Sequence, residues 1–96
     1  MIRVNVRMMG TLRDATGRSE EELSLEEGAD VSSAIRELID EHGEELERAL
    51  VDPVIQSALP NALILLNGVE IGNLKGLVTA LRDGDKMVLL PVTHGG

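Results

Sequence analysis

One stretch of the chain has the clear periodicity of an amphipathic helix, and it lies between two groups of strand-like segments. Apolar residues recur there at intervals of three and four, at Val31, Ala34, Ile35, Leu38 and Ile39. Asp30 is suited to cap the start of this helix, because its carboxylate can accept a hydrogen bond from an early backbone N–H, and Gly43 is suited to end it. A chain of 96 residues forms one modest core. The helix therefore has to pack on the sheet that the flanking segments form.

The segments before the helix predict a β-hairpin. Apolar residues alternate with polar ones over residues 2–8, which is the period of a strand with one buried face. Residues 10–18 have the composition of a connecting loop, and residues 21–25 alternate again, with Glu21 on the face of the leucines. We expect the carboxylates of residues 20–22 to be solvated.

The segments after the helix predict a short helical piece and a second hairpin. Apolar residues at helical spacing cover residues 46–50. Residues 62–66 form an apolar run, and a second strand-like run follows at residues 69–71. The Asn67-Gly68 pair between them tolerates positive φ at both positions, so it is the strongest hairpin signal in the chain.

The order of elements predicts the fold class. Residues 74–81 fit either a loop or a short helix, and residues 86–92 form a final strand whose pairing should fail about Pro91, which has no N–H to donate. Two strands, a helix, two strands and a final strand indicate an α+β fold of the β-grasp (ubiquitin-like) type, in which one main helix crosses a mixed sheet. We expect a β-grasp domain over residues 1–92 and a flexible C-terminal tail over residues 93–96.

The composition argues against several functional classes. The chain has no aromatic residue, so its core is aliphatic and it offers no platform on which bases can stack. Its net charge of −8 repels phosphates, which also argues against a nucleic-acid partner. With no cysteine it has no disulfide, thiolate nucleophile or thiol metal site. We find neither a signal-peptide pattern nor a membrane-spanning run, and we expect a cytoplasmic protein with no membrane partner.

The negative charge is concentrated in the middle of the chain. Residues 19–52 hold 13 acidic residues and two arginines, a local charge of −11, whereas the remainder holds 7 basic and 4 acidic residues, a charge of +3. This acidic segment can be interpreted in two ways. It is either a solvated face that keeps the protein soluble or a surface that steers a basic partner.

The most informative motif is the end of the sequence, Pro91-Val92-Thr93-His94-Gly95-Gly96. The two glycines have no Cβ, so they fit a narrow channel in another protein and leave the terminal carbonyl carbon unhindered. The β-branched Val92 and Thr93 favour an extended approach to them. The pattern predicts a tail whose Gly96 carboxylate is activated by a partner enzyme. The alternative is a frayed end in which the two glycines are incidental.

Three stretches of the sequence carry a family resemblance. They are residues 12–17, residues 65–68, and residues 81–92 together with Gly95-Gly96. In the third, a Gly-Asp turn and an apolar strand lead into a proline-containing tail, which resembles the molybdopterin synthase small subunit and ThiS (MoaD/ThiS) family. The His-Gly-Gly ending also resembles ubiquitin-related modifiers that serve tRNA thiolation. The family often has phenylalanines in its first and last strands, where this chain has Met8, Met9, Leu89 and Leu90. It also commonly has two consecutive prolines near the tail, where this chain has only Pro91, and these differences leave the specific partner open.

The resemblance implies a sulfur carrier rather than an enzyme. A ubiquitin-activating-type (MoeB/ThiF-like) enzyme would adenylate Gly96, and delivered sulfur would give a C-terminal thiocarboxylate. The sulfur would pass to a molybdopterin precursor, with the molybdopterin synthase large subunit as partner, or to a thiolated tRNA or another product. Some archaeal relatives join the same carboxylate to lysines of target proteins. Adenylation would belong to the partner, and the chain itself would hold no cofactor.

The final strand also predicts a docking surface. Both of its faces are apolar, and only one can face the helix. Val88 and Leu90 should therefore lie on exposed apolar surface, extended by Met9 and Pro91, where a partner binds. The alternative is that a segment such as residues 52–61 covers this face.

Neither histidine is expected to catalyse a reaction. No nucleophile and base surround His94, which we expect to shape the tail, and His42 should make a favourable contact with a helix dipole. We expect no metal site, because no ligands cluster in the sequence. Three functions stay open: a sulfur carrier, a protein modifier, and a β-grasp binding module. An independent enzyme is the least favoured, because no residue set supplies a nucleophile, a base and a pocket together.

Overall fold

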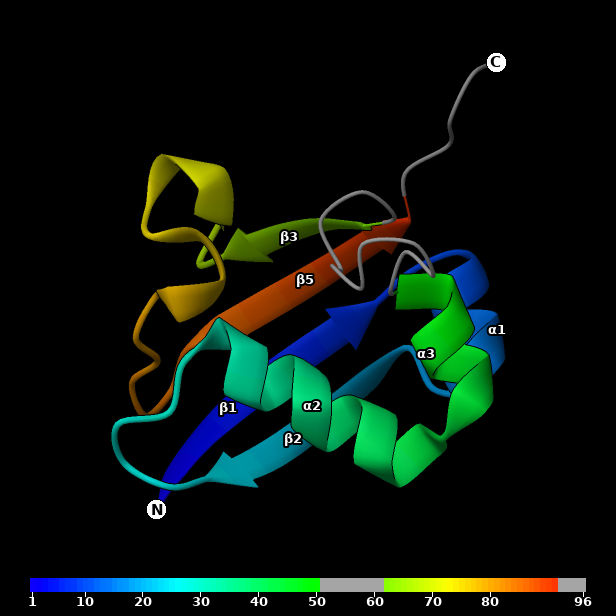
Figure 1. Cartoon of the computed structure of the whole chain (residues 1–96), viewed down its shortest axis with the longest axis horizontal. Helices are drawn as coiled ribbons and strands as arrows, with labels where there is room; N and C mark the ends of the chain where they lie inside the picture. The colour runs from blue at the N-terminus through cyan, green and yellow to red at the C-terminus, as the bar shows by residue number, and fades with distance from the viewer. Residues whose placement is uncertain (51–61, 92–96) are drawn as a thin grey trace.

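A five-stranded mixed sheet forms one layer of the fold, and helix α2 crosses one of its faces (Figure 1). The computed structural model describes residues 1–50 and 62–91. The strands are β1 (Ile2–Met8), β2 (Glu20–Leu25), β3 (Ala62–Leu66), β4 (Val69–Glu70) and β5 (Lys86–Pro91). The helices are α1 (Thr11–Thr16), α2 (Val31–His42) and α3 (Glu44–Leu50), and two 3₁₀ turns, η1 (Ile71–Asn73) and η2 (Gly76–Val78), follow β4.

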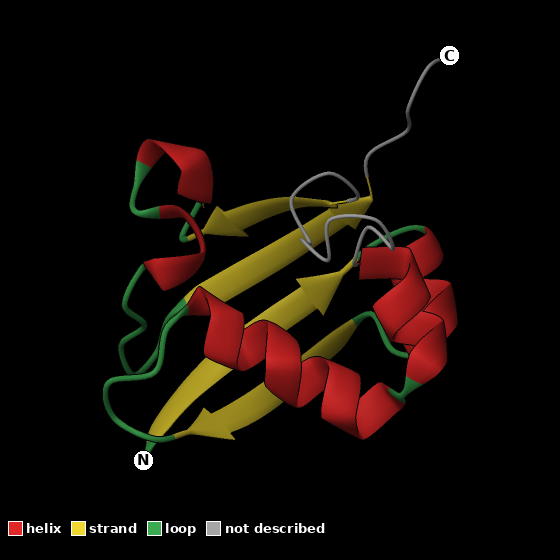
Figure 2. Cartoon of the chain, viewed as in Figure 1, coloured by secondary structure: helices red, strands yellow, loops and turns green. Residues whose placement is uncertain are grey.

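The sheet places the first and last strands side by side at its centre. The strand order is β2-β1-β5-β3-β4, in which β1 is antiparallel to β2 and parallel to β5, while β3 is antiparallel to β5 and β4. Two parallel strands need a crossover connection, and α2 lies within it (Figure 2). This is the predicted α+β, β-grasp arrangement.

Helix α2 begins where the sequence predicts, because the Asp30 side chain satisfies one of its first backbone donors. The Asp30 carboxylate accepts hydrogen bonds from the Ser33 backbone N–H at 2.9 Å and the Ser32 hydroxyl at 2.6 Å. The Asp30 N–H in turn donates to the Ser33 hydroxyl at 3.3 Å, which completes a capping box. The predicted apolar face is buried in the core through Val31, Ala34, Ile35 and Leu38.

Substitution of this cap is expected to cost stability in a pH-dependent way. The hydrogen bond from Ser32, followed by those from Ser33, holds the pKa of Asp30 below its ordinary value of 3.8. A lowered pKa means that the ionised carboxylate stabilises the fold fully above pH 3.8 and less as the pH falls through the folded-state pKa. Asp30→Ala should therefore lower the free energy of unfolding by about 1 kcal/mol at neutral pH.

The measurement is urea unfolding of both proteins at neutral pH and again below pH 3.8, where the difference between them should shrink. Asp40→Ala is the matched control, because Asp40 is an exposed acid on the same helix. An equal loss of stability in both variants would contradict the capping role.

The expected loop of residues 10–18 is wrong, because Thr11–Thr16 forms helix α1. The helix is held by one core contact, the fully buried Leu12. It ends at Gly17, which has φ +72° and donates its N–H to the Arg13 carbonyl at 2.8 Å. A single buried residue in six shows no periodicity, so the sequence pattern could not reveal this helix.

The second half of the chain follows the predicted order with small differences. The hairpin turn is confirmed, with φ of +51° at Asn67 and +85° at Gly68. β4 is only two residues long, because the buried Ile71 already belongs to η1. Residues 74–81, which fit either a loop or a short helix, contain the turn η2, and the helical piece expected at residues 46–50 is α3.

The final strand runs to the end of the described chain. Pairing does not fail at Pro91, which lies opposite Ala62 in the antiparallel pair of β5 with β3. The predicted tail, Thr93, His94, Gly95 and Gly96, lies outside the described residues, as does the segment 52–61 that was considered as a cover for the sheet. Among the helices of residues 1–50 and 62–91, none has the length and apolarity needed to span a bilayer.

Candidate functional site

The strand that leads to the C-terminus is a central strand of the sheet. β5 pairs with β1 on one side and with β3 on the other. Its last described residue, Pro91, packs against Gly10 so closely that a Cβ on Gly10 would lie 2.8 Å from the proline Cγ. Gly10 has φ +59°, a conformation that favours glycine. The point from which the last five residues depart is therefore fixed by two strands and one close contact.

The two faces of β5 differ as the sequence predicts. Met87 and Leu89 are fully buried on the face toward α2. Val88 and Leu90 are half-buried on the opposite face, as is Pro91 at the end of the strand. The apolar residues of the second face are thus accessible, although they are half-buried rather than fully exposed.

Strand β3 enlarges this accessible apolar surface. Leu63 lies opposite Leu90 and Leu65 lies opposite Val88 in the antiparallel register. Leu63 is 37% exposed and Leu65 is half-buried. We call these four side chains, Leu63, Leu65, Val88 and Leu90, the outer patch.

Met9 lies beside the outer patch, at the end of β1. Its backbone N–H donates to the Leu89 carbonyl at 3.2 Å, and its side chain is 43% exposed. The expectation that Met9 is accessible next to the final strand is therefore confirmed. A flexible, polarizable methionine at the border of an apolar patch suits a surface that adapts to a partner.

The neighbouring strands β1 and β2 carry charged and polar side chains on the outer face, so the outer patch has a polar border. Arg7 lies opposite Val88 on one side and opposite Glu20 on the other. Farther along, Arg3 and Glu22 form an exposed ion pair at 3.8 Å. An apolar centre with a polar border is the usual arrangement of a protein–protein contact surface.

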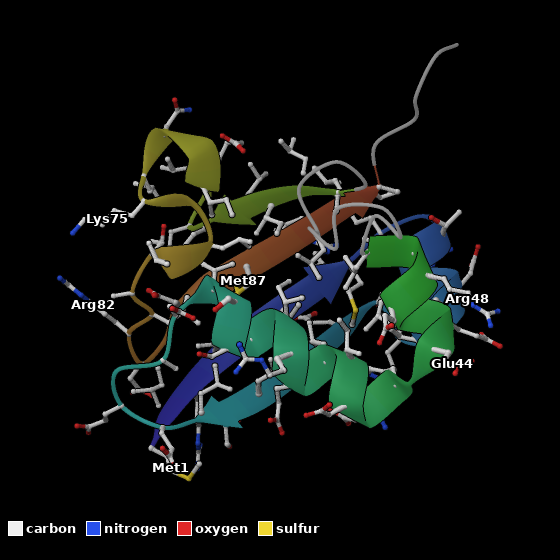
Figure 3. The ribbon with its side chains drawn as sticks, viewed as in Figure 1. Met1, Glu44, Arg48, Lys75, Arg82 and Met87 are labelled. Atoms are coloured by element: carbon white, nitrogen blue, oxygen red, sulfur yellow. The ribbon has the colours of Figure 1, made fainter. Side chains whose placement is uncertain are left out.

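The acidic middle of the chain lies mainly on the helical side of the molecule. Figure 3 shows Glu44 and Arg48 on the outside of α3, where they form an exposed ion pair at 3.2 Å. Glu45 and Glu47 of the same helix are also exposed. The docking surface predicted from β5 and the acidic surface therefore belong to different parts of the fold.

One prediction about the acidic residues is wrong, because Glu21 is buried rather than solvated. Its side chain is only 3% exposed and accepts a hydrogen bond from His42 at 2.8 Å. The signal was present in the sequence, since Glu21 has the same strand parity as Leu23 and Leu25. His42 lies in the last turn of α2, as expected, but its ring faces this carboxylate.

Three potential metal ligands meet at this point, although none cluster in the sequence. Glu21, Glu41 and His42 each place a ligand atom within 4.8 Å of the other two. The residues come from β2 and from the end of α2, about 20 positions apart, so only the folded chain brings them together.

The comparisons with known proteins agree with this geometry. The ThiS family matches residues 6–96. Small archaeal modifier protein 3 of Haloferax volcanii is 29% identical over 93 residues, which cover 97% of this chain and 98% of that protein.

Solved structures give the same result at the level of the fold. Small archaeal modifier protein 1 of Methanosarcina acetivorans is 31% identical, with a TM-score of 0.84, over 100% of this chain and 98% of that chain. A candidate molybdopterin converting factor subunit 1 of Pyrococcus furiosus is 28% identical, with a TM-score of 0.76, over 97% of this chain and 100% of that chain. With a β-grasp fold and a match that reaches the last residue, the chain belongs to the ThiS family of ubiquitin-like sulfur carriers and small modifiers.

Proposed function

We propose that this protein is a sulfur carrier whose Gly96 carboxylate is activated by an adenylating enzyme and converted to a thiocarboxylate. The observation that carries the proposal is the family match through the terminal Gly-Gly, together with the firmly held strand that leads to it. The anchored Pro91 gives the partner a fixed point of departure, and the two glycines supply a slender, unhindered end.

In adenylation and sulfur transfer, the only reacting group that this chain contributes is its C-terminal carboxylate. An oxygen of the Gly96 carboxylate attacks the α-phosphate of ATP, and pyrophosphate leaves to give an acyl-adenylate. A sulfur nucleophile supplied by the partner system then attacks the acyl carbon, and AMP leaves with the electron pair of the broken C–O bond. The partner binds ATP and stabilises the charge, while this protein presents the reacting carbon in the right position.

The outer patch is the surface that we assign to partner docking. Its four side chains are apolar and accessible, and Arg7 and Met9 lie at its border. We propose that the activating enzyme binds here, and that the same surface then receives the acceptor enzyme. The acceptor that we favour is a molybdopterin precursor held by a large synthase subunit, because one structural relative is described as a molybdopterin converting factor subunit.

A second candidate function is protein modification, because two relatives are named small archaeal modifier proteins. In this case a lysine amine of a target attacks the activated Gly96 carbonyl, and an isopeptide bond replaces the bond to the leaving group. Both functions share the activation step, so they differ only in the nucleophile that receives the acyl group.

Intact-mass measurement of the protein purified from its own cells tests the sulfur-carrier proposal. A fraction of the molecules should be heavier by the difference between one sulfur and one oxygen atom, and fragmentation should place the increase on Gly96. Cells starved of sulfur are the control, because the heavier species should disappear there.

A terminal carboxylate that stays unmodified under sulfur-replete conditions would contradict the sulfur-carrier proposal. The modifier function predicts instead a Gly-Gly remnant on lysines of other proteins after digestion. Detection of that remnant without any thiocarboxylate would favour the second function.

A further inference from the structure

A buried carboxylate on the sheet, that of Glu21, has a histidine on one oxygen and an exposed arginine at the edge of ion-pair distance on the other. Glu21 lies on the inner face of β2, opposite Val6, and its side chain is 3% exposed. His42, the last residue of α2, is 11% exposed and its Nε2 lies 2.8 Å from Glu21 Oε1. A buried carboxylate is costly unless hydrogen bonds or an opposite charge compensate it.

A second carboxylate lies at the same place. Glu41 precedes His42 at the end of α2, is exposed, and brings an oxygen within 4.8 Å of the ligand atoms of Glu21 and His42. The three groups join the beginning of β2 to the end of α2, near the corner where the chain turns into α3 (Figure 1). Two carboxylates and one imidazole thus converge on one point.

The local charge favours a cation. Exposed acids lie next to the group in sequence, at Glu20, Glu22 and Asp40. The nearest basic side chain among the described ion pairs is Arg18, whose guanidinium nitrogen lies 3.9 Å from the other oxygen of Glu21 and whose side chain is 64% exposed. Arg18 therefore supplies a screened, peripheral charge, and the negative charge around the group remains in excess.

We propose that Glu21, Glu41 and His42 bind a divalent transition-metal ion, with Zn²⁺ as the representative cation. Imidazole nitrogen and carboxylate oxygen are both zinc ligands, and water completes the four-coordinate shell. The ion takes the place of the hydrogen between His42 Nε2 and Glu21 Oε1, and any proton displaced goes to solvent. Mg²⁺ is disfavoured, because it prefers oxygen ligands to imidazole.

The proposed ion would act as a cross-link within the fold. It would tie the start of β2 to the end of α2, next to Gly43, which has φ +81° and ends the helix. The outer patch lies on the opposite face of the sheet, so metal binding would stabilise the scaffold without touching the docking surface. The proposal is therefore independent of the proposed function.

Calorimetric titration of the untagged full chain with Zn²⁺ tests the proposal. One ion should bind per chain, and Mg²⁺ should give no saturable heat. His42→Ala should weaken zinc binding at least about tenfold, which is the smaller effect known for loss of a residue that only supports a ligand. The matched control is His94→Ala, because the chain has two histidines and His94 is the other.

Two exposed positions protect the test against loss of folding. Glu41→Gln removes a ligand charge without disturbing a buried side chain, so it should also weaken zinc binding. Arg18→Gln removes the cation that competes for Glu21, so it should strengthen zinc binding. If Glu21, Glu41 and His42 served only as an ion-pair network, this substitution would not raise the affinity for zinc. At a hundredfold excess of Zn²⁺ over Kd, the Tm of the native chain should rise by roughly 10–20 °C.

Absence of saturable zinc binding would overturn the proposal. Equal weakening by His42→Ala and His94→Ala would do the same, because it would mean that the histidines bind metal without a defined site. Thiocarboxylate formation on Gly96 is measured separately, so failure of the metal site and failure of the sulfur-carrier function can be told apart.

Discussion

Deletion of Gly96 is expected to abolish adenylation of this protein while leaving its fold intact. The shortened chain still ends in a carboxylate, now on Gly95, but that group stops about 3.3–3.6 Å short of the position where the activating enzyme aligns it with ATP. A displacement of about 1 Å can already cost about 10²-fold in rate. We therefore expect a loss of adenylation of more than about 10²-fold in ATP–pyrophosphate exchange with the cognate activating enzyme.

Two controls separate the position of the carboxylate from other effects of the deletion. Gly96→Ala keeps the length and adds one methyl group, so its activity should lie between those of the native and shortened chains. Urea unfolding should give the same midpoint for all three proteins, because the last described contact of the fold is made by Pro91. Full exchange activity of the shortened chain would favour the reading in which the Gly-Gly pair is incidental.

The sequence was sufficient for the elements whose periodicity extends over many residues. The apolar spacing of α2 and the alternation in β1 and β2 are local consequences of which side of each element meets the core, so they are visible without the fold. Helix α1 was not predictable in this way. It has six residues and one core side chain, Leu12, and its ends depend on the positive φ of Gly10 and Gly17.

Only the residues of the outer patch that lie on β5 could be predicted from the sequence. The two apolar faces of β5 already indicate that Val88 and Leu90 face away from α2. Which residues join them depends on the register of β3, and an entirely apolar run such as residues 62–66 does not reveal which of its side chains point outward. Leu63 and Leu65 therefore become part of the outer patch only when the strand pairing is known.

The Glu21–His42 contact shows a different limit of sequence analysis. Strand parity places Glu21 among the inward-facing leucines, but a run of three glutamates reads as a solvated surface. The compensating partner lies 21 positions away, at the end of a helix. A long-range polar pair of this kind follows from how α2 crosses the sheet, and no local pattern encodes that crossing.

Substitution of the most exposed member of the outer patch is expected to disrupt partner binding with little effect on folding. Leu63 is 37% exposed and lies opposite Leu90, so Leu63→Glu places a charge within the apolar surface. A charge without a partner in a desolvated contact is unfavourable, and loss of a contact residue that dominates binding costs about 2 kcal/mol or more. That energy corresponds to roughly a 30-fold rise in the KM of the activating enzyme for this protein.

The matched control is Val78→Glu, which introduces the same charge at an apolar residue outside the outer patch. Val78 lies in η2 and is 67% exposed, so the substitution should change neither the fold nor the KM appreciably. The kcat for adenylation should change less than the KM in Leu63→Glu, because the tail that carries the reacting carboxylate is untouched. An equal rise in KM for both variants would indicate nonspecific charge repulsion, and an unchanged KM for Leu63→Glu would remove the outer patch from the docking surface.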